Sequence, residues 1–204
     1  HPIVAACERI INGEFHDQFI VEIIQGGAGT STNMNANEVI ANVALELIGK
    51  EKGDYETISP LNHVNMSQST NDTYPTALLV GFLKEYDPLL EAIKSLSESF
   101  HAKGVEFADV IKMGRTQLQD AVPMSLGQEF TAFGNTLLDD IKRLNEMSQL
   151  FLEVNLGATA IGTGINSHLD YPKIAVEALA DLSGLPLVLA PNPIAATSDT
   201  SAFV

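Results

Sequence analysis

Three segments of the chain concentrate small polar side chains and interrupt the helical spacing of the apolar residues around them. They run from Gln25 to Asn33, from His63 to Asp72 and from Met113 to Pro123. Hydroxyl groups, side-chain amides and a glycine-rich backbone can together donate several hydrogen bonds to one anion. These segments are therefore the candidate binding elements of the protein.

The first segment, QGGAGTSTN, places glycines and Thr30 ahead of a helix that the apolar spacing predicts from Glu38 to Ile48. Its glycines permit positive φ, and a helix N-terminus attracts anions. The nucleotide-phosphate patterns GxGxxG and GxxxxGK(S/T) are both missing. An ordinary helix cap explains the same residues equally well, so both interpretations stay open.

In the second segment, Ser69, Thr70 and Asn71 follow one another ahead of a helical stretch that we predict to begin near Thr76. Two hydroxyls and an amide beside the free N–H groups of a helix start suit a carboxylate. The alternative is a capping box in which Ser69 or Asp72 is the cap.

The third segment is a polar connector between two long predicted helices, and it contains Arg115, Thr116 and Gln117. Arg115 can neutralise a carboxylate, but an ion pair with Asp120 is the simpler structural role. A fourth, glycine-rich stretch over residues 155–164 lacks the lysine of a phosphate-binding loop, and we predict a tight loop after the long helix instead.

Apolar residues at spacings of three and four predict an all-α protein. The longest run extends from about Pro123 to Glu153, and Asp87-Pro88 indicates a continuation or a kink of the preceding helix. A helix of that length, about 45 Å, needs neighbours along its whole length, which favours a bundle that extends across subunits. Gly127 and Gly134 either let another helix approach closely or simply weaken this one.

The composition, 45% hydrophobic and 18% charged over 204 residues, is that of a globular protein. No apolar run reaches the roughly 20 residues of a membrane span, and no signal peptide is recognisable, so we expect a cytoplasmic protein. The net charge of −15 argues against nucleic-acid and membrane partners. The single Cys7 and five dispersed histidines show no metal-ligand spacing.

Taken together, the three segments resemble the aspartase/fumarase superfamily, and the match extends over essentially the whole chain. The loop from Gly26 to Ser31 resembles the aspartase form, Thr70 stands where class II fumarases usually carry serine, and Gln117 stands where they carry histidine. The resemblance implies an all-α, long-helix bundle of this type, here incomplete, in a homotetramer whose active sites each combine three subunits. It also implies that residues 1–70 are the C-terminal portion of the N-terminal domain and residues 71–204 the first part of the central bundle domain.

The reaction that the resemblance implies is the reversible deamination of L-aspartate to fumarate and ammonia through an aci-carboxylate, without a cofactor or a metal. Fixed donors can each stabilise such an intermediate by on the order of 3 kcal/mol in a dry site. By matching position, Asn71 holds the amino group and Thr116 the second carboxylate. The remaining matched positions hold the reacting carboxylate: Thr30, Ser69 and Thr70.

Gln117 departs from the superfamily members that carry histidine at this position. Because an amide cannot shuttle protons, we expect the role of Gln117 to be auxiliary. The superfamily's serine base and a substrate-binding lysine belong to a mobile loop that the 204 residues do not include. We therefore assign no catalytic residue here, interpret the chain from His1 to Val204 as a fragment, and expect it to lack lyase activity alone. The alternatives are a fragment of a class II fumarase-like hydratase and a non-catalytic helical assembly module.

Overall fold

The computed structural model describes residues 1–24 and 27–200, so Gln25 and Gly26 of the first polar segment lie outside the described residues. The chain forms two compact units. One contains residues 1–80 and the residues from 152 onward, and the other contains residues 81–151. These units are defined by their internal contacts, and the predicted domain division at residue 70 stays a prediction.

The first unit is built on the packing of α1 (Pro2–Ile11) against α2 (Thr30–Leu47), with the short turns η1 (His16–Gln18) and η2 (Pro60–Val64) beside them. Burying this apolar surface stabilises the pair by about 25 cal/mol per Å². The core residues of this part are Ala6, Val39, Ala41, Val43, Ala44, Leu45 and Ile58.

Helix α2 begins eight residues earlier than the sequence predicted, because the polar residues from Thr30 onward join it as helical turns. The predicted stop is confirmed, since Gly49 has a φ of 73°, a left-handed conformation that glycine adopts without strain. Near this end of the helix Leu47 is 43% exposed, whereas Leu45 is fully buried.

Helix α3 (Thr70–Glu106) begins six residues before the predicted start near Thr76 and runs from the first unit into the second. It continues through Pro88 as one helix, at the cost of the hydrogen bond that the proline nitrogen cannot donate. The sequence had left continuation and kink open at this position.

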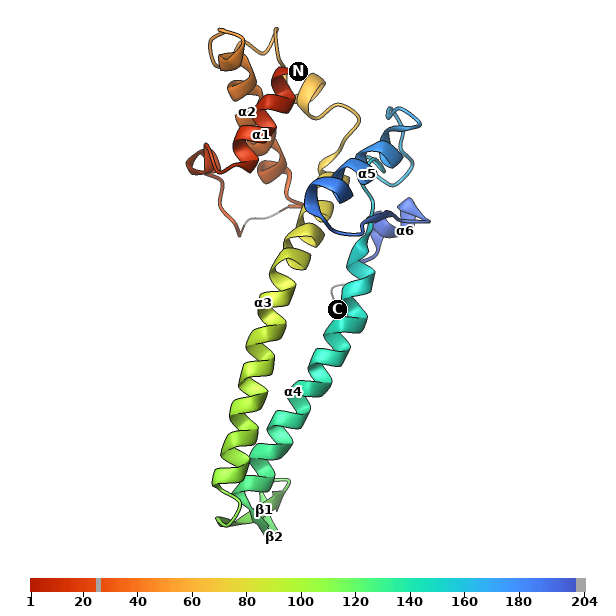
Figure 1. Cartoon of the computed structure of the whole chain (residues 1–204). Helices are drawn as coiled ribbons and strands as arrows, with labels where there is room; N and C mark the ends of the chain where they lie inside the picture. Colours follow the sequence, from red (N-terminus) through yellow and green to blue (C-terminus); the bar gives the residue numbers. More distant parts are fainter. Residues whose placement is uncertain (25–26, 201–204) are drawn as a thin grey trace. The chain divides into compact units, whose positions relative to one another are not determined.

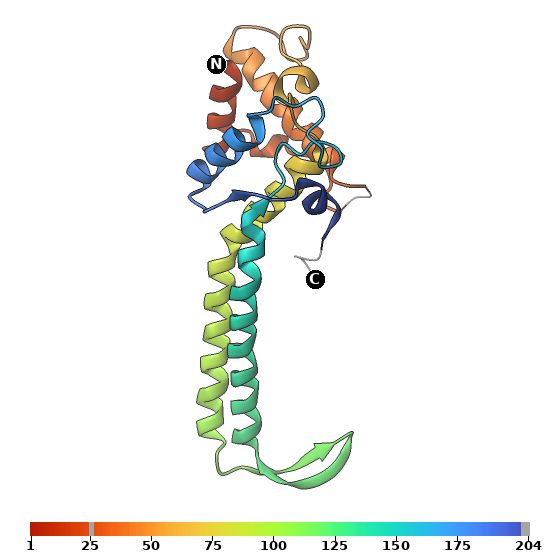
Figure 2. The same ribbon diagram turned by 90° about the vertical axis from the view of Figure 1, so that its right-hand side faces the viewer.

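The second unit pairs the residues of α3 from Gly81 onward with α4 (Leu126–Ser148), and a β-hairpin joins the two helices. Figures 1 and 2 show these helices side by side, with β1 (Ile111–Thr116) and β2 (Gln119–Ser125) at one end. The strands pair antiparallel, with an irregularity between Met113 and Arg115. The third polar segment is thus a connector, as predicted, but in the form of a hairpin. Phe100 of α3 makes ring contacts with Phe130 and Phe133 of α4, and Phe107, directly after α3, contacts Phe130.

The predicted helix from Pro123 to Glu153 is therefore shorter than expected at both ends. Pro123 lies in β2, and Glu153 lies in the short strand β3 (Glu153–Val154), after the turn η3 (Gln149–Leu152). The helix start is set by a reciprocal capping box in which Ser125 Oγ accepts from the Gln128 N–H at 3.1 Å and Gln128 Oε1 accepts from the Ser125 N–H at 3.0 Å.

Beyond β3, the first unit is completed by a loop, α5 (Tyr171–Ser183), β4 (Val188–Leu189) and α6 (Pro193–Ser198). β3 and β4 pair in parallel. The loop predicted over residues 155–164 is confirmed, since this stretch contains neither helix nor strand. With only four short strands among the described residues, the protein has the all-α, long-helix fold that the sequence predicted.

Candidate functional site

The N-terminus of α3 carries three of the predicted site residues in one turn of chain. Ser69 caps the helix, because its Oγ accepts from the Asn71 N–H at 3.2 Å, while the Asp72 carboxylate accepts from the Ser69 N–H at 3.0 Å. The capping interpretation of this segment is therefore confirmed. A hydroxyl that accepts one hydrogen bond keeps its own proton, so Ser69 can still donate to an anion.

Side-chain hydrogen bonds join this turn to the first polar segment. Asn33, one turn along α2 from Thr30, donates from Nδ2 to Thr70 Oγ1 at 3.0 Å. Its Oδ1 accepts from Thr73 Oγ1 at 3.2 Å. The structure thus brings the start of α2 and the start of α3 together within one unit, with the Thr70 hydroxyl proton still available.

Thr30 itself is exposed at the first position of α2, where no described residue hydrogen-bonds to its side chain. Gly29 precedes it with a φ of 84°, and a Cβ there would lie 2.3 Å from the Tyr74 ring of α3. Glycine is therefore required for both the backbone conformation and the close approach. This contact holds Thr30 near the second segment.

Asn71 is held by a loop that the sequence analysis did not connect with the site. Its side-chain Nδ2 donates to the Ala160 carbonyl at 2.7 Å, and its own carbonyl accepts from Asn155 Nδ2 at 3.1 Å. The sequence alone predicts only a tight loop for this fourth segment. Nothing in its spacing indicated this contact, because the two partners are 89 residues apart.

Asp72, noted in the sequence only as a possible cap, is fully buried beneath this turn. Burial raises the pKa of its carboxyl, although hydrogen bonds from the backbone N–H groups of Ser69, Thr159 and Gly157 oppose the rise. Among the described residues no lysine, arginine or histidine forms an ion pair with it. Within the part of the chain that the structure describes, only backbone N–H groups donate to it.

Thr116 and Gln117 lie in the other unit, at the turn of the β1–β2 hairpin. Gln117 and Leu118 both have positive φ, 47° and 70°, which suits a two-residue hairpin turn but strains residues other than glycine. The predicted ion pair of Arg115 with Asp120 is present at 3.4 Å. Both of its side chains are largely exposed, so it contributes at most about 1 kcal/mol.

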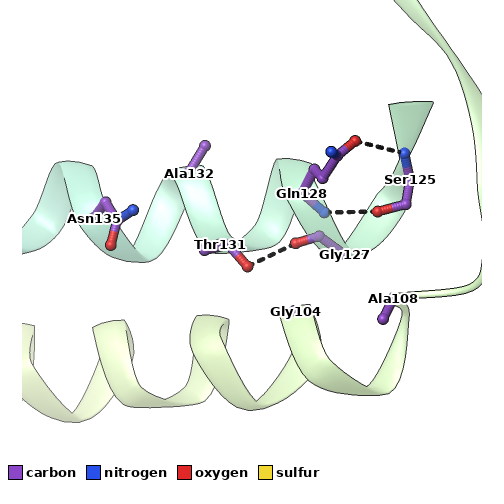
Figure 3. Close-up of a pocket in the computed structure, with 8 residues that line it drawn as sticks. All are labelled: Gly104, Ala108, Ser125, Gly127, Gln128, Thr131, Ala132 and Asn135. Carbon is purple, nitrogen blue, oxygen red and sulfur yellow. Dashed lines mark hydrogen bonds between the residues drawn. The ribbon is translucent and has the colours of Figure 1, made fainter. Parts of the chain in front are cut away.

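The described second unit also has a hollow of about 370 Å³ between the C-terminal end of α3 and the start of α4. Figure 3 shows the capping bonds of Ser125 and Gln128 on one side and the facing backbone at Gly104 on the other. None of its lining residues is charged, and none belongs to the predicted site.

Residues 1–24 and 27–200 contain neither a membrane-spanning helix nor a cluster of metal-ligating side chains. No helix there is both long enough and apolar enough to cross a membrane. No group of three or more histidine, cysteine, aspartate or glutamate side chains there is arranged to hold a metal ion.

Comparison with known proteins places these polar segments in a family. The family model described as "Lyase" matches residues 1–204. The chain belongs to this lyase family. It is 62% identical over 203 residues to an aspartate ammonia-lyase of Pseudomonas aeruginosa, covering 99% of the chain and 43% of that protein. It is 53% identical to the aspartate ammonia-lyase of Escherichia coli, covering 99% of the chain and 42% of that protein.

Solved structures of this lyase family share the fold. A fumarate lyase:delta crystallin from Brucella melitensis superimposes with a TM-score of 0.87 at 56% identity, covering 99% of this chain and 44% of that one. A class II fumarase from Schistosoma mansoni superimposes with a TM-score of 0.83 at 34% identity, covering 98% and 45%. The chain spans about 43% of the length of the curated relatives it matches. The predicted membership of the aspartase/fumarase superfamily is confirmed.

Proposed function

We propose that this chain supplies a substrate-binding part of an enzyme that converts L-aspartate reversibly into fumarate and ammonia. The observation that carries the proposal is the turn of Ser69, Thr70 and Asn71, whose two hydroxyls keep their protons at a helix N-terminus joined to the start of α2. Identities of 53–62% to aspartate ammonia-lyases support the choice of reaction.

The chemistry requires that a proton leave the carbon beside the side-chain carboxylate of aspartate. The electron pair of that C–H bond moves into the carboxylate, giving an aci-carboxylate with extra negative charge. As this pair returns to form the C=C bond, the C–N bond breaks and ammonia leaves. Donors that are fixed before the reaction stabilise the intermediate without reorganising, and this is the role we give to Thr30, Ser69 and Thr70.

Asn71 is assigned to the amino group, Thr116 to the second carboxylate and Gln117 to an auxiliary contact. As the resemblance to the superfamily implies, we propose that the hairpin of another subunit contributes Thr116 and Gln117 to each site of a homotetramer. Exposed apolar side chains on α3 and α4, such as Leu89, Leu96 and Phe133, support such packing. The absence of a cofactor or metal and a cytoplasmic location remain predictions.

A hydratase that interconverts malate and fumarate is the second candidate, supported by the likeness to the class II fumarase from Schistosoma mansoni. Both reactions form fumarate, so the dicarboxylate donors suit either. Thr70 and Gln117, which differ from the fumarase pattern, favour the ammonia-lyase.

The test uses the intact protein and follows the ultraviolet absorbance of fumarate with L-aspartate or L-malate as substrate. We expect fumarate from aspartate, and Thr70→Ala to lower kcat/KM by about a hundredfold, as removal of one oxyanion donor does. Thr136→Ala, which removes an exposed hydroxyl on α4 bonded to its own helix, is the matched control and should leave the rate unchanged. Faster turnover of malate than of aspartate would replace the proposal with the hydratase.

A further inference from the structure

Among the described residues, the buried carboxylate of Asp72 accepts hydrogen bonds only from backbone N–H groups. Its Oδ2 accepts from the N–H groups of Thr159 at 2.8 Å and Gly157 at 3.2 Å, and its Oδ1 accepts from Ser69 at 3.0 Å. A buried carboxylate is costly unless hydrogen bonds satisfy it. Since 85 residues separate Asp72 from Gly157, this side chain ties the start of α3 to the distant loop.

The loop that Asp72 holds has a conformation that needs support. Thr159 has a φ of 59°, which is unfavourable for a β-branched residue. Its buried hydroxyl has no hydrogen-bond partner among the described residues. Gly157 has a φ of 86°, and a Cβ there would lie 2.7 Å from Pro172. Strain of this kind persists only where surrounding contacts over-determine it, and the Asp72 carboxylate is one such contact.

Ala160, next in the chain, fixes the amide of Asn71. A backbone carbonyl can only accept a hydrogen bond, so the Asn71 atom 2.7 Å from Ala160 O must be the NH₂ nitrogen. The amide oxygen then occupies the other position, and no described residue donates to it. An amide oriented in this way offers an acceptor, which suits the donor hydrogens of an ammonium group.

We infer that Asp72 is a positioning residue for amine recognition: it holds the loop from Gly157 to Ala160 so that the Ala160 carbonyl turns the oxygen of Asn71 toward the substrate's amino group. This inference rests on the proposed function. It separates amine recognition from carboxylate recognition, because Thr30, Ser69, Thr70 and Thr116 are assigned to the carboxylates.

The effect on amine recognition can be measured apart from the effect on carboxylate recognition in the reverse reaction, where ammonia and fumarate are separate substrates. In the intact protein, Asp72→Asn keeps the side-chain volume. Its amide oxygen can still accept from the Ser69 N–H, while its NH₂ group replaces the oxygen that accepts from Thr159 and Gly157. We expect the KM for ammonia to rise about tenfold, while the KM for fumarate stays within about twofold of its original value. Asp87→Asn, at an exposed position of α3, is the matched control and should change neither constant.

A purely structural role would reduce the amount of active enzyme and leave both KM values unchanged, so unchanged KM values or an equal rise in both would overturn the inference. A crystal structure of the Asp72→Asn variant supplies a readout that does not depend on activity. We expect the contact between Asn71 Nδ2 and Ala160 O to be lost, and its persistence would overturn the inference. A wild-type protein inactive with aspartate and with fumarate plus ammonia would overturn the proposed function, while a lost contact would still support the positioning of Asn71.

If Asp72→Asn does not fold, Thr159→Gly decides the question. Glycine keeps the N–H that Asp72 binds and relieves the positive φ, so the variant should fold while Ala160 becomes less constrained. A KM for ammonia raised by about threefold or more, with that for fumarate unchanged, supports the inference. An unchanged KM for ammonia in this folded variant overturns it.

Discussion

At the candidate site, one hydroxyl group can stabilise the fold through its oxygen and bind a ligand through its proton. Ser69 accepts a backbone hydrogen bond as a helix cap, and Thr70 accepts one from the side-chain amide of Asn33, yet no described residue accepts either hydroxyl proton. A capping interpretation and a binding interpretation of these positions therefore do not compete. The hydrogen bonds that fix the oxygen atoms also hold the donors still before a ligand arrives, which is what electrostatic stabilisation requires.

Gly29 offers a test at the scale of one residue. Gly29→Ala adds a Cβ that would lie 2.3 Å from the Tyr74 ring, at a φ of 84°. We expect the free energy of unfolding, measured in urea, to fall by about 3 kcal/mol from strain and overpacking together. Gly53→Ala, at a φ of 86° with nothing within 4 Å, should lose only the backbone part, about 1 kcal/mol. Equal losses of unfolding free energy in the two variants would show that the close approach of Gly29 to Tyr74 does not contribute to stability.

At the scale of elements, glycines decide how closely α3 and α4 pack. A Cβ on Gly127 would lie 2.3 Å from the Gly104 carbonyl oxygen, and one on Gly134 would lie 2.7 Å from the His101 ring. The sequence left close approach and simple helix weakening equally open at both positions. The structure shows close approach, because backbone and ring atoms of the neighbouring helix occupy the space that a Cβ would need at each position.

Three alanine substitutions rank these contacts. Gly127→Ala meets backbone, which cannot move away without shifting a helix, so we expect a loss of about 3 kcal/mol. Gly134→Ala meets a side chain that can turn, and the expected loss is smaller, about 1 kcal/mol. Gly81→Ala, in α3 with nothing within 4 Å, should instead stabilise the protein by about 1 kcal/mol through helix propensity. Thermal unfolding of the three variants checks the order, and a stabilising Gly127→Ala would refute the close packing.

At the scale of the whole molecule, this chain leaves much apolar surface uncovered. Leu89 and Leu96, two turns apart on α3, are each 48% exposed, and Phe133 on α4 is 46% exposed. Apolar rows of this kind on long helices are typical of surfaces that pack in a bundle. The net charge of −15 works in the opposite direction, since copies of the chain repel one another at long range.

The proposed tetramer therefore predicts that one charge on the apolar row weakens assembly. In the intact protein, Leu89→Lys should shift the sedimentation-velocity profile from tetramer toward smaller species, because burying an unpaired ammonium is costly. Glu91→Lys introduces the same residue two positions along the same helix, at an exposed polar site, and should stay assembled. A Leu89→Lys variant that remains fully tetrameric would place the interface elsewhere.

The sequence by itself determined the all-α class, the glycine stop after α2 and the polar segments, because apolar periodicity and backbone preferences are local properties. It also determined the family, since the segments keep their order and spacing along the chain. The ends of α3 and α4 were misplaced because caps such as Ser69 and Ser125 act through hydrogen bonds whose partners the apolar spacing does not reveal.

Only the tertiary structure decided what holds the site together. Asp72 and Ala160 were not recognised as parts of it, since their contacts join segments more than 80 residues apart. The hairpin carrying Thr116 was missed because a strained two-residue turn of Gln117 and Leu118 has no glycine or asparagine signal. Such features depend on contacts across the fold, which stabilise backbone conformations that local preference alone disfavours.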